Sequence, residues 1–166
     1  MQFAILGPVE ARTNGSALQL GGPKPRALLA MLLLDANEPV SRDRLIEGLW
    51  GDDPPPSADQ TLDSYVSRLR RVLGPDRVVR RPPGYLLVVE PGELDLERFE
   101  RLVEARSLHE ALRLWRGPAL ADVLYEPFAC EQAERLEERR LVALEDRIEA
   151  DLATGEGAGL HGASLD

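Results

Sequence analysis

The stretch that decides the fold runs from Ser41 to Gly74 and reads SRDRLIEGLWGDDPPPSADQTLDSYVSRLRRVLG. Two segments with helical spacing of apolar residues flank a stiff loop, GDDPPPS. Ser41 is a suitable N-cap for the first segment, and Ser57 with Gln60 fits a capping box for the second. Gly74 and the proline after it end the second segment. The pattern predicts a short helix, a tight loop and a longer helix.

The longer helix has a basic exposed face. Its apolar residues follow a 4-3-4 spacing and predict a buried stripe made of Leu62, Val66, Leu69 and Leu73. Away from that stripe the side chains are small and polar in the first half and basic in the second: Ser64, Ser67, Arg68 and Arg71. Short side chains let a helix approach base edges, and arginine offers a bidentate fork for guanine. This face suits a helix that enters the major groove of DNA.

The flanking sequence completes a domain over residues 1–91. Residues 1–22 predict a small antiparallel meander or hairpin with a turn at Thr13–Ser16, and a largely apolar helix is predicted from Arg26 to Asn37. After the longer helix, RVVRRPPGYLLVVE predicts two strands, with Gly84 expected to supply a positive φ in their turn. Arg80 and Arg81 precede this turn, where a wing would reach the DNA backbone or minor groove. The expected fold is α+β, with N-terminal strands, three helices and a C-terminal β-hairpin wing.

Residues 92–166 are expected to form an all-α, helical-repeat-like domain. Helices are predicted over residues 95–106, 108–115 and 126–155. In the last of these, a core stripe is predicted from Ala133, Leu136, Leu141, Leu144, Ile148 and Leu152. From about residue 155 the chain is rich in glycine and small residues, and a flexible tail is expected.

The net charge of −9 belongs to this second domain. Residues 1–91 carry 11 basic and 11 acidic residues, whereas residues 92–166 carry 9 and 18. Between Val66 and Arg81 six arginines face a single acidic residue, Asp76. Because salt screens exposed charges beyond roughly 8 Å, a partner senses the local patch more than the total. The basic patch is expected to face DNA and the acidic helices to face protein partners.

Several classes of function find no support in the sequence. No apolar stretch approaches the ~20 residues of a membrane span, and no export signal opens the chain, so a cytoplasmic protein is expected. Cys130 is the single cysteine, and His109 and His161 are isolated, so no disulfide, metal site or cofactor is predicted. GGPKPR, residues 21–26, lacks the spacing of a phosphate loop. We therefore expect no enzyme and no catalytic residues.

Taken together, these motifs resemble a known family of regulators. Residues 39–74 followed by PPGYLL resemble the winged-helix output domain of OmpR-type regulators, and more narrowly that of the SARP (AfsR/DnrI/RedD) family. ALRLWRGPALADV and EQAERLEERRLVALEDRIEADLATG resemble the bacterial transcriptional activation domain that follows it in that family. The resemblance implies a nucleoid-associated activator of secondary-metabolite (antibiotic) biosynthesis genes. Such a protein binds direct repeats in double-stranded DNA near promoters and engages RNA polymerase.

The resemblance also implies residue roles. It puts Ser64, Arg68 and Arg70 at base edges, Thr61, Tyr65 and Arg71 at phosphates, and Arg81 in the wing. Lys24, ahead of the first helix, is a weaker phosphate candidate, because Pro25 stands where the family usually has a polar residue. Three aromatic residues are expected in the core instead: Trp50, Tyr85 and Trp115.

The second domain departs from the family pattern because it is short. Only VEARSLHEALR joins its first and second motifs, and further helical pairs normally follow. Stacked repeats need neighbours to bury their faces. We therefore expect this domain to be stabilised by packing on the first domain or by homodimerisation. An alternative function follows, in which the chain is a protein-interaction module that dimerises with or modulates full-length regulators without activating by itself.

Overall fold

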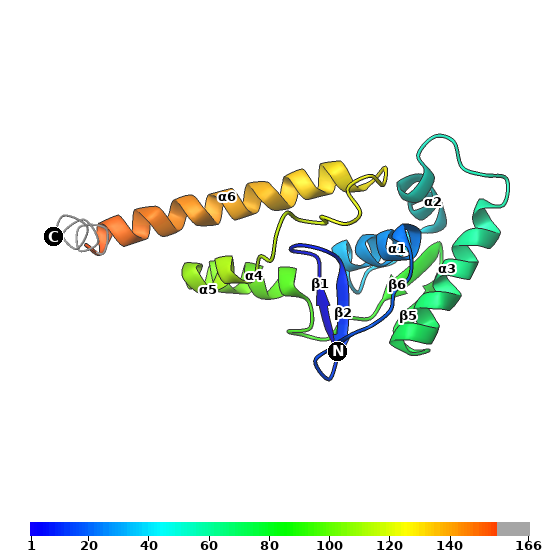
Figure 1. Cartoon of the computed structure of the whole chain (residues 1–166), viewed down its shortest axis with the longest axis horizontal. Coiled ribbons are helices and arrows are strands. Elements are labelled where there is room, and N and C mark those ends of the chain that lie inside the picture. The colour runs from blue at the N-terminus through cyan, green and yellow to red at the C-terminus, as the bar shows by residue number, and fades with distance from the viewer. Residues whose placement is uncertain (156–166) are drawn as a thin grey trace.

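The computed structural model describes residues 1–155, and the predicted flexible tail lies outside the described residues. The elements follow the predicted order of strands, three helices, a hairpin and further helices (Figure 1). They are β1 (Gln2–Ala4), β2 (Glu10–Thr13), β3 (Ser16–Ala17), α1 (Pro23–Leu34), β4 (Val40–Ser41), α2 (Arg42–Trp50), α3 (Ala58–Leu73), β5 (Val78–Arg81), β6 (Gly84–Leu87), α4 (Asp95–Glu104), α5 (Leu108–Arg113) and α6 (Ala129–Ala153). We call residues 1–91 the N-terminal region and residues 92–155 the C-terminal region.

The first sheet is the predicted meander, with strand order β1-β2-β3. Asn14 and Gly15 join β2 to β3 with φ angles of 52° and 78°. Two consecutive positive φ values match the twist of a two-residue hairpin, and asparagine and glycine adopt them at least cost. Buried Phe3 and Ala11 lie opposite each other and face the core.

The second sheet, in the order β4-β6-β5, contains the predicted wing hairpin. Gly84 begins β6 and pairs with Ser41 of β4 and Arg81 of β5. The expectation of a positive φ at Gly84 is wrong, because Gly84 is not among the glycines with positive φ. Instead, a Cβ at this position would overlap the carbonyl of Val40 and lie 2.8 Å from its carbon. Close approach of β4 is therefore the reason for glycine here.

The three helices of the N-terminal region pack as their apolar patterns predict. Nearly all of α1 is buried, and the α3 stripe from Leu62 to Leu73 is buried as expected. The Ser41 hydroxyl caps α2 by accepting a hydrogen bond from the Arg44 backbone N–H at 3.1 Å. The predicted capping box at Ser57 is wrong, since its side chain makes no cap hydrogen bond.

The first helix begins earlier than expected. It starts at Pro23 rather than Arg26, so both prolines of GGPKPR lie in its first turn. Backbone N–H groups have no intrahelical acceptor in a first turn, and proline is tolerated there for that reason.

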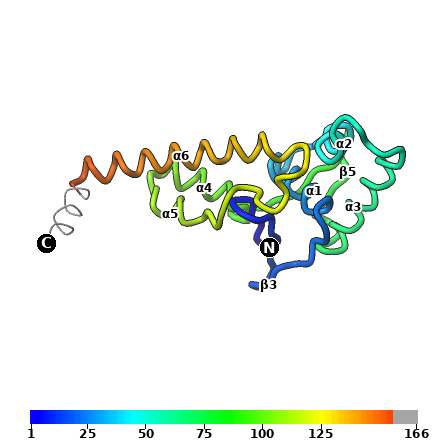
Figure 2. The backbone as a smooth tube through the Cα atoms, turned by 45° about the horizontal axis from the view of Figure 1, so that its top comes forward, coloured from blue at the N-terminus to red at the C-terminus, as the bar shows by residue number. Residues whose placement is uncertain are grey.

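In the C-terminal region, α6 runs over α4 and α5 and projects beyond them (Figures 1 and 2). Its buried residues are Ala129, Ala133, Leu136 and Ala143. The predicted core stripe is therefore wrong in its second half. Leu141, Ile148 and Leu152 are 54%, 48% and 64% exposed. They lie on the side of α6 that no described element covers.

The two regions share one hydrophobic core, which runs from Phe3 to Ala143. The segment after β1 is held by the C-terminal region through hydrogen bonds. The Asp95 carboxylate, in a residue only 2% exposed, accepts bonds from the backbone N–H groups of Ile5 and Leu6 at 2.9–3.1 Å. Burial raises the pKa of Asp95, and these N–H donors act in the opposite direction. The C-terminal region is thus packed on the N-terminal region, one of the two modes of stabilisation that the sequence suggests.

Further backbone bonds tie the same segment to residues 116–122. The N–H groups of Arg116 and Leu120 donate to the carbonyls of Leu6 and Ile5 at 2.9 and 3.1 Å. The Val9 N–H donates to the Asp122 carboxylate at 2.8 Å.

Within residues 1–155, none of the helices has the length and apolar character needed to span a membrane.

Candidate nucleic-acid interface

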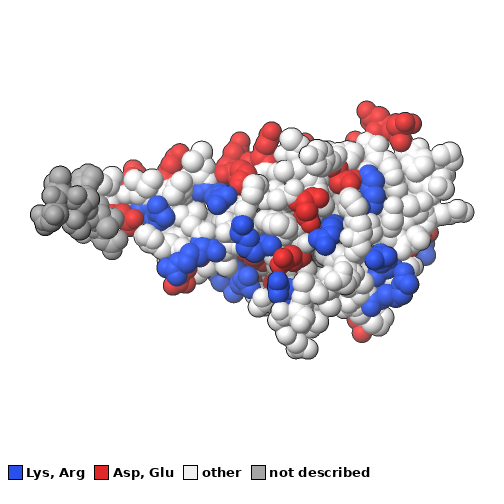
Figure 3. Space-filling view, in the orientation of Figure 1, with Lys and Arg blue, Asp and Glu red and all other residues white. Residues whose placement is uncertain are grey.

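The exposed face of α3 carries the residues that the sequence singled out. Leu62, Val66 and Leu69 hold the helix against α1 and α2, because they are almost fully buried. The opposite face is then turned to solvent, and Ser64, Ser67, Arg68 and Arg71 are all exposed, while Thr61 near its first turn is half-buried. In Figure 3, basic side chains gather over the C-terminal half of α3.

Ion pairing separates the basic residues of this face from those elsewhere in the N-terminal region. Six of its 11 Lys and Arg residues are paired with a carboxylate: Arg12, Lys24, Arg26, Arg42, Arg44 and Arg77. Within residues 1–155 the other five have no such partner: Arg68, Arg70, Arg71, Arg80 and Arg81. All five lie on α3 or β5. The uncompensated positive charge of this region is therefore collected on one helix and the adjoining wing.

The Arg68 side chain is fixed by the linker that precedes α1. Its Nε donates to the Leu20 carbonyl at 3.0 Å. The side chain passes over Gly21, where a Cβ would lie 2.7 Å from the guanidinium carbon. The terminal nitrogens of Arg68 make no hydrogen bond to the described part of the chain. Arg68 is thus oriented through Nε and keeps its bidentate edge for a ligand.

Arg70 takes a different place from the one that the resemblance implies. Its Nε donates to the Val78 carbonyl at 3.0 Å, and its guanidinium lies 5.8 Å from the centre of the Tyr85 ring. Tyr85 is buried in the core, as expected. Arg70 therefore packs α3 against the wing and does not extend from the exposed face.

Two exposed carboxylates on α3 share one arginine of α2. Arg42 forms ion pairs with Asp63 at 2.8 Å and with Asp59 at 3.2 Å, and the Tyr85 hydroxyl donates to Asp63 at 3.0 Å. The hydrogen bond from Arg42 lowers the pKa of Asp63, and the same bond raises the pKa of Arg42. One positive charge faces two negative ones, so this network reduces the repulsion that two free carboxylates would offer to a phosphate backbone. The sequence analysis missed it, because Arg42 and Asp63 meet only in the folded protein.

Tyr65 and Lys24 meet at Trp50. The Tyr65 ring stacks on Trp50 with 6.3 Å between centroids and 21° between planes. Lys24 lies 5.6 Å from the centre of the same Trp50 ring and binds the Glu126 carboxylate at 2.6 Å and the Leu49 carbonyl. Lys24 is thus engaged with the C-terminal region, and the geometry argues against the phosphate contact suggested for it.

Two family models match this chain. The model "Transcriptional regulatory protein, C terminal" matches residues 16–87, and the model "Bacterial transcriptional activator domain" matches residues 94–163. The first match covers the three helices and the wing, and the second covers α4 to α6.

Regulatory proteins of actinobacteria are similar to nearly the whole chain. Regulatory protein AfsR of Streptomyces griseus is 39% identical over 93% of this chain and 17% of its own length. Regulatory protein DnrI of Streptomyces peucetius is 38% identical over 96% of this chain and 68% of its own length. A solved structure of Mycobacterium tuberculosis EmbR with a low-affinity phosphopeptide has a TM-score of 0.83 and 34% identity, over 96% of this chain and 47% of that one.

These matches confirm the expected winged helix followed by a helical domain. The chain spans 17% of AfsR, 57% of the M. tuberculosis regulator MoaR1 and 46% of EmbR, so it corresponds to only part of these relatives. These relatives are named as regulatory or transcriptional regulatory proteins. This chain belongs to the SARP (AfsR/DnrI/RedD) family of transcriptional regulators.

Proposed function

We propose that the chain binds double-stranded DNA in a sequence-specific manner, with α3 in the major groove and the β5–β6 wing at the backbone or minor groove. One observation carries the proposal: the five basic residues of the N-terminal region that have no carboxylate partner among residues 1–155 all lie on α3 and β5. Arginines that pair within a protein contribute little to an external anion, whereas unpaired ones release DNA counterions on binding.

The residue roles follow from exposure and geometry. We assign Ser64 and Arg68 to base edges, because both are exposed and the Arg68 fork is oriented by Leu20. Phosphate contacts are assigned to Thr61, Tyr65 and Arg71, and the wing contact to Arg81. Arg70 is assigned a positioning role, because it holds α3 and the wing in a fixed relation.

The regulatory role is proposed from the relatives. DnrI and AfsR are named as regulatory proteins, and the C-terminal region matches a transcriptional activator domain. We propose that the chain activates secondary-metabolite genes from direct repeats near their promoters, with its acidic C-terminal region engaging RNA polymerase. A place on the nucleoid in the cytoplasm follows from this activity.

The test is fluorescence anisotropy on a library of genomic fragments, with a salt titration for each variant. Arg68→Ala is expected to cost about 1–3 kcal/mol and to relax sequence preference at one position. Arg71→Ala is expected to weaken binding to all fragments alike and to lower the salt slope by about 1. Arg113→Ala, an exposed arginine on α5, is the matched control and leaves both unchanged. Equal effects of all three variants would refute the assignment.

A second candidate function rests on the uncovered side of α6. Leu141, Val142, Ile148 and Leu152 are 48–64% exposed, and contiguous exposed apolar residues mark interaction surfaces. The chain would then act as an interaction module, pairing with itself or with longer relatives. Sedimentation equilibrium decides this: a dimer that Leu141→Gln with Ile148→Gln dissociates supports it, and a monomer at all concentrations excludes self-pairing.

A further inference from the structure

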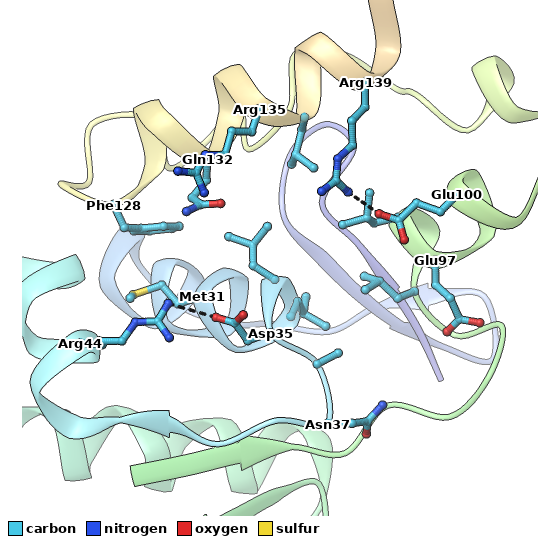
Figure 4. Close-up of a pocket in the computed structure, with 16 residues that line it drawn as sticks. Met31, Asp35, Asn37, Arg44, Glu97, Glu100, Phe128, Gln132, Arg135 and Arg139 are labelled. Atoms are coloured by element: carbon cyan, nitrogen blue, oxygen red, sulfur yellow. Dashed lines mark hydrogen bonds and ion pairs between the residues drawn. The ribbon is translucent and has the colours of Figure 1, made fainter. Parts of the chain in front are cut away.

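A cavity of about 550 Å³ lies where the two regions meet. Figure 4 shows it between the C-terminal half of α1, the facing side of α4 and the first turns of α6, with Arg44 reaching in from α2. Ligand pockets in proteins measure roughly 300–1,000 Å³ and occur preferentially at domain interfaces. Both the size and the position of this cavity fit a small-molecule site.

The cavity has an apolar wall drawn from four segments. The wall residues include Met31, Leu34, Leu94, Leu96, Phe128 and Leu136. An apolar ligand body gains binding free energy in proportion to the apolar area that it removes from water on such a wall. The first requirement on a ligand is therefore an apolar body.

The rim of the cavity is polar and is closed by two ion pairs (Figure 4). Arg44 binds Asp35 at 3.3 Å and joins α2 to α1, while Arg139 binds Glu100 and joins α6 to α4. Each of these guanidinium groups uses one terminal nitrogen in its ion pair. The other nitrogens of both arginines stay available at the rim.

The unused hydrogen-bonding capacity of the rim consists mainly of donors. The Gln132 side chain makes no hydrogen bond within residues 1–155, and Arg135 makes one, to Glu131 at 2.8 Å. Both partners of that pair are well exposed, so it holds Arg135 weakly. Figure 4 shows Gln132 and Arg135 extending from α6 toward the cavity. The rim also holds three carboxylates, and each accepts hydrogen bonds through one oxygen: Asp35 from Arg44, Glu100 from Arg139, and Glu97 from Arg101 and the Gly92 N–H.

We propose that this cavity binds an amphipathic organic anion, whose apolar body lies on the wall and whose acidic group is bound by Arg135 and Gln132. A carboxylate or sulfonate matches the planar fork of arginine and the amide N–H₂ of glutamine. Such a ligand touches both regions of the chain at once. It also touches Met31 and Phe128, which crowd Gly48 of α2: a Cβ there would lie 2.6 Å from the Met31 sulfur and 3.3 Å from the Phe128 Cβ.

The test uses two fluorescent probes that differ in one charge. 8-Anilinonaphthalene-1-sulfonate carries the sulfonate, and N-phenyl-1-naphthylamine has the same aromatic body without it. We expect the sulfonate probe to bind the full chain at least fivefold more tightly than the neutral probe. Gln132→Ala with Arg135→Ala is expected to abolish this difference, whereas Arg113→Ala preserves it. Equal affinity of the two probes for the unaltered chain would overturn the proposal.

A second set of variants separates the cavity from the exposed side of α6. Ala36→Phe places a large ring at the cavity lining and is expected to weaken both probes at least fivefold. Leu141→Gln with Ile148→Gln removes the exposed apolar face and is expected to leave both affinities unchanged. If the α6 variant abolishes binding and the Ala36 variant does not, the probes bind α6 and the cavity assignment is wrong. The readout is independent of DNA, so failure here leaves the proposed function untouched.

Discussion

The ion pair between Lys24 and Glu126 gives a sharp test of how the two regions are joined. Glu126 is 8% exposed and Lys24 is 29% exposed, with 2.6 Å between Nζ and the carboxylate. Breaking a fully buried pair costs about 3–5 kcal/mol. In Glu126→Gln, the Lys24 ammonium keeps its hydrogen bond to the Leu49 carbonyl and its partial exposure to water. We therefore expect a loss of about 2 kcal/mol in the free energy of unfolding. Lys24→Met strands a buried carboxylate and is expected to cost about 3 kcal/mol.

The double variant makes this prediction decisive. In the double variant Lys24→Met with Glu126→Gln, no buried charge is left without a partner. Its loss in free energy of unfolding is expected to be about 2–3 kcal/mol, well below the sum of the two single losses. Urea unfolding of the four proteins measures the coupling free energy, expected to be about 2 kcal/mol. Single effects that add within about 0.5 kcal/mol would refute an energetic link. Lys24→Met is also expected to leave the salt dependence of DNA affinity unchanged. A decrease of about 1 in the salt slope would instead indicate that Lys24 contacts a DNA phosphate.

Three further predictions concern the fold. Gly84→Ala drives a methyl group into the Val40 carbonyl and is expected to lower the free energy of unfolding by about 3 kcal/mol or more, measured by urea titration. Arg77 lowers the pKa of Glu93, so this pair stabilises the protein at neutral pH and loses its contribution as pH falls below 4.5. The urea midpoint of Glu93→Gln should therefore vary less between pH 7 and pH 3 than that of the unaltered protein. Asp95→Ala removes the acceptor of buried backbone N–H groups and is expected to cost about 2–4 kcal/mol by thermal or urea unfolding.

The variants at Gly84 and Glu93 each have a matched control on the exposed surface. Gly15→Ala retains open space around the new methyl group but strains a φ of 78°, so it is expected to cost only about 1 kcal/mol. Glu131→Gln breaks an exposed helical pair and is expected to change stability by less than about 0.5 kcal/mol at any pH. If either control changed the free energy of unfolding as much as its buried counterpart, burial and close approach would not be the cause of the larger loss.

Local sequence patterns predicted the features that depend on neighbouring residues. The α3 stripe repeats at helical spacing, the Ser41 cap precedes its helix directly, and Asn14-Gly15 specifies a tight hairpin. Each of these is decided within a few residues of chain. The winged helix could therefore be predicted from the order of such elements.

The remainder depends on contacts between distant residues. The apolar positions of α6 repeat along its whole length, but Ala143 is the last of them in the core, and Leu141, Ile148 and Leu152 lie on the side that its neighbours leave exposed. Periodicity alone therefore overestimates the core. Lys24 and Arg70 are basic residues near the expected interface, yet their partners Glu126 and Val78 are set by tertiary packing. The residues of the candidate site could be predicted from the sequence. Which of the basic residues are ion-paired could be seen only in the structure.

The hydrogen bonds that hold residues 5–9 have a consequence for how the chain is made. Ile5 and Leu6 depend on Asp95, which leaves the ribosome about 90 residues later. At roughly 5–20 residues per second, the segment after β1 waits roughly 5–20 s for these acceptors. The N-terminal region cannot complete its backbone pairing before the C-terminal region is synthesised. A chimera that grafts this winged helix onto another regulator would therefore need to carry residues 94–122 with it, since a cut at residue 91 would separate residues 5–9 from their hydrogen-bond partners.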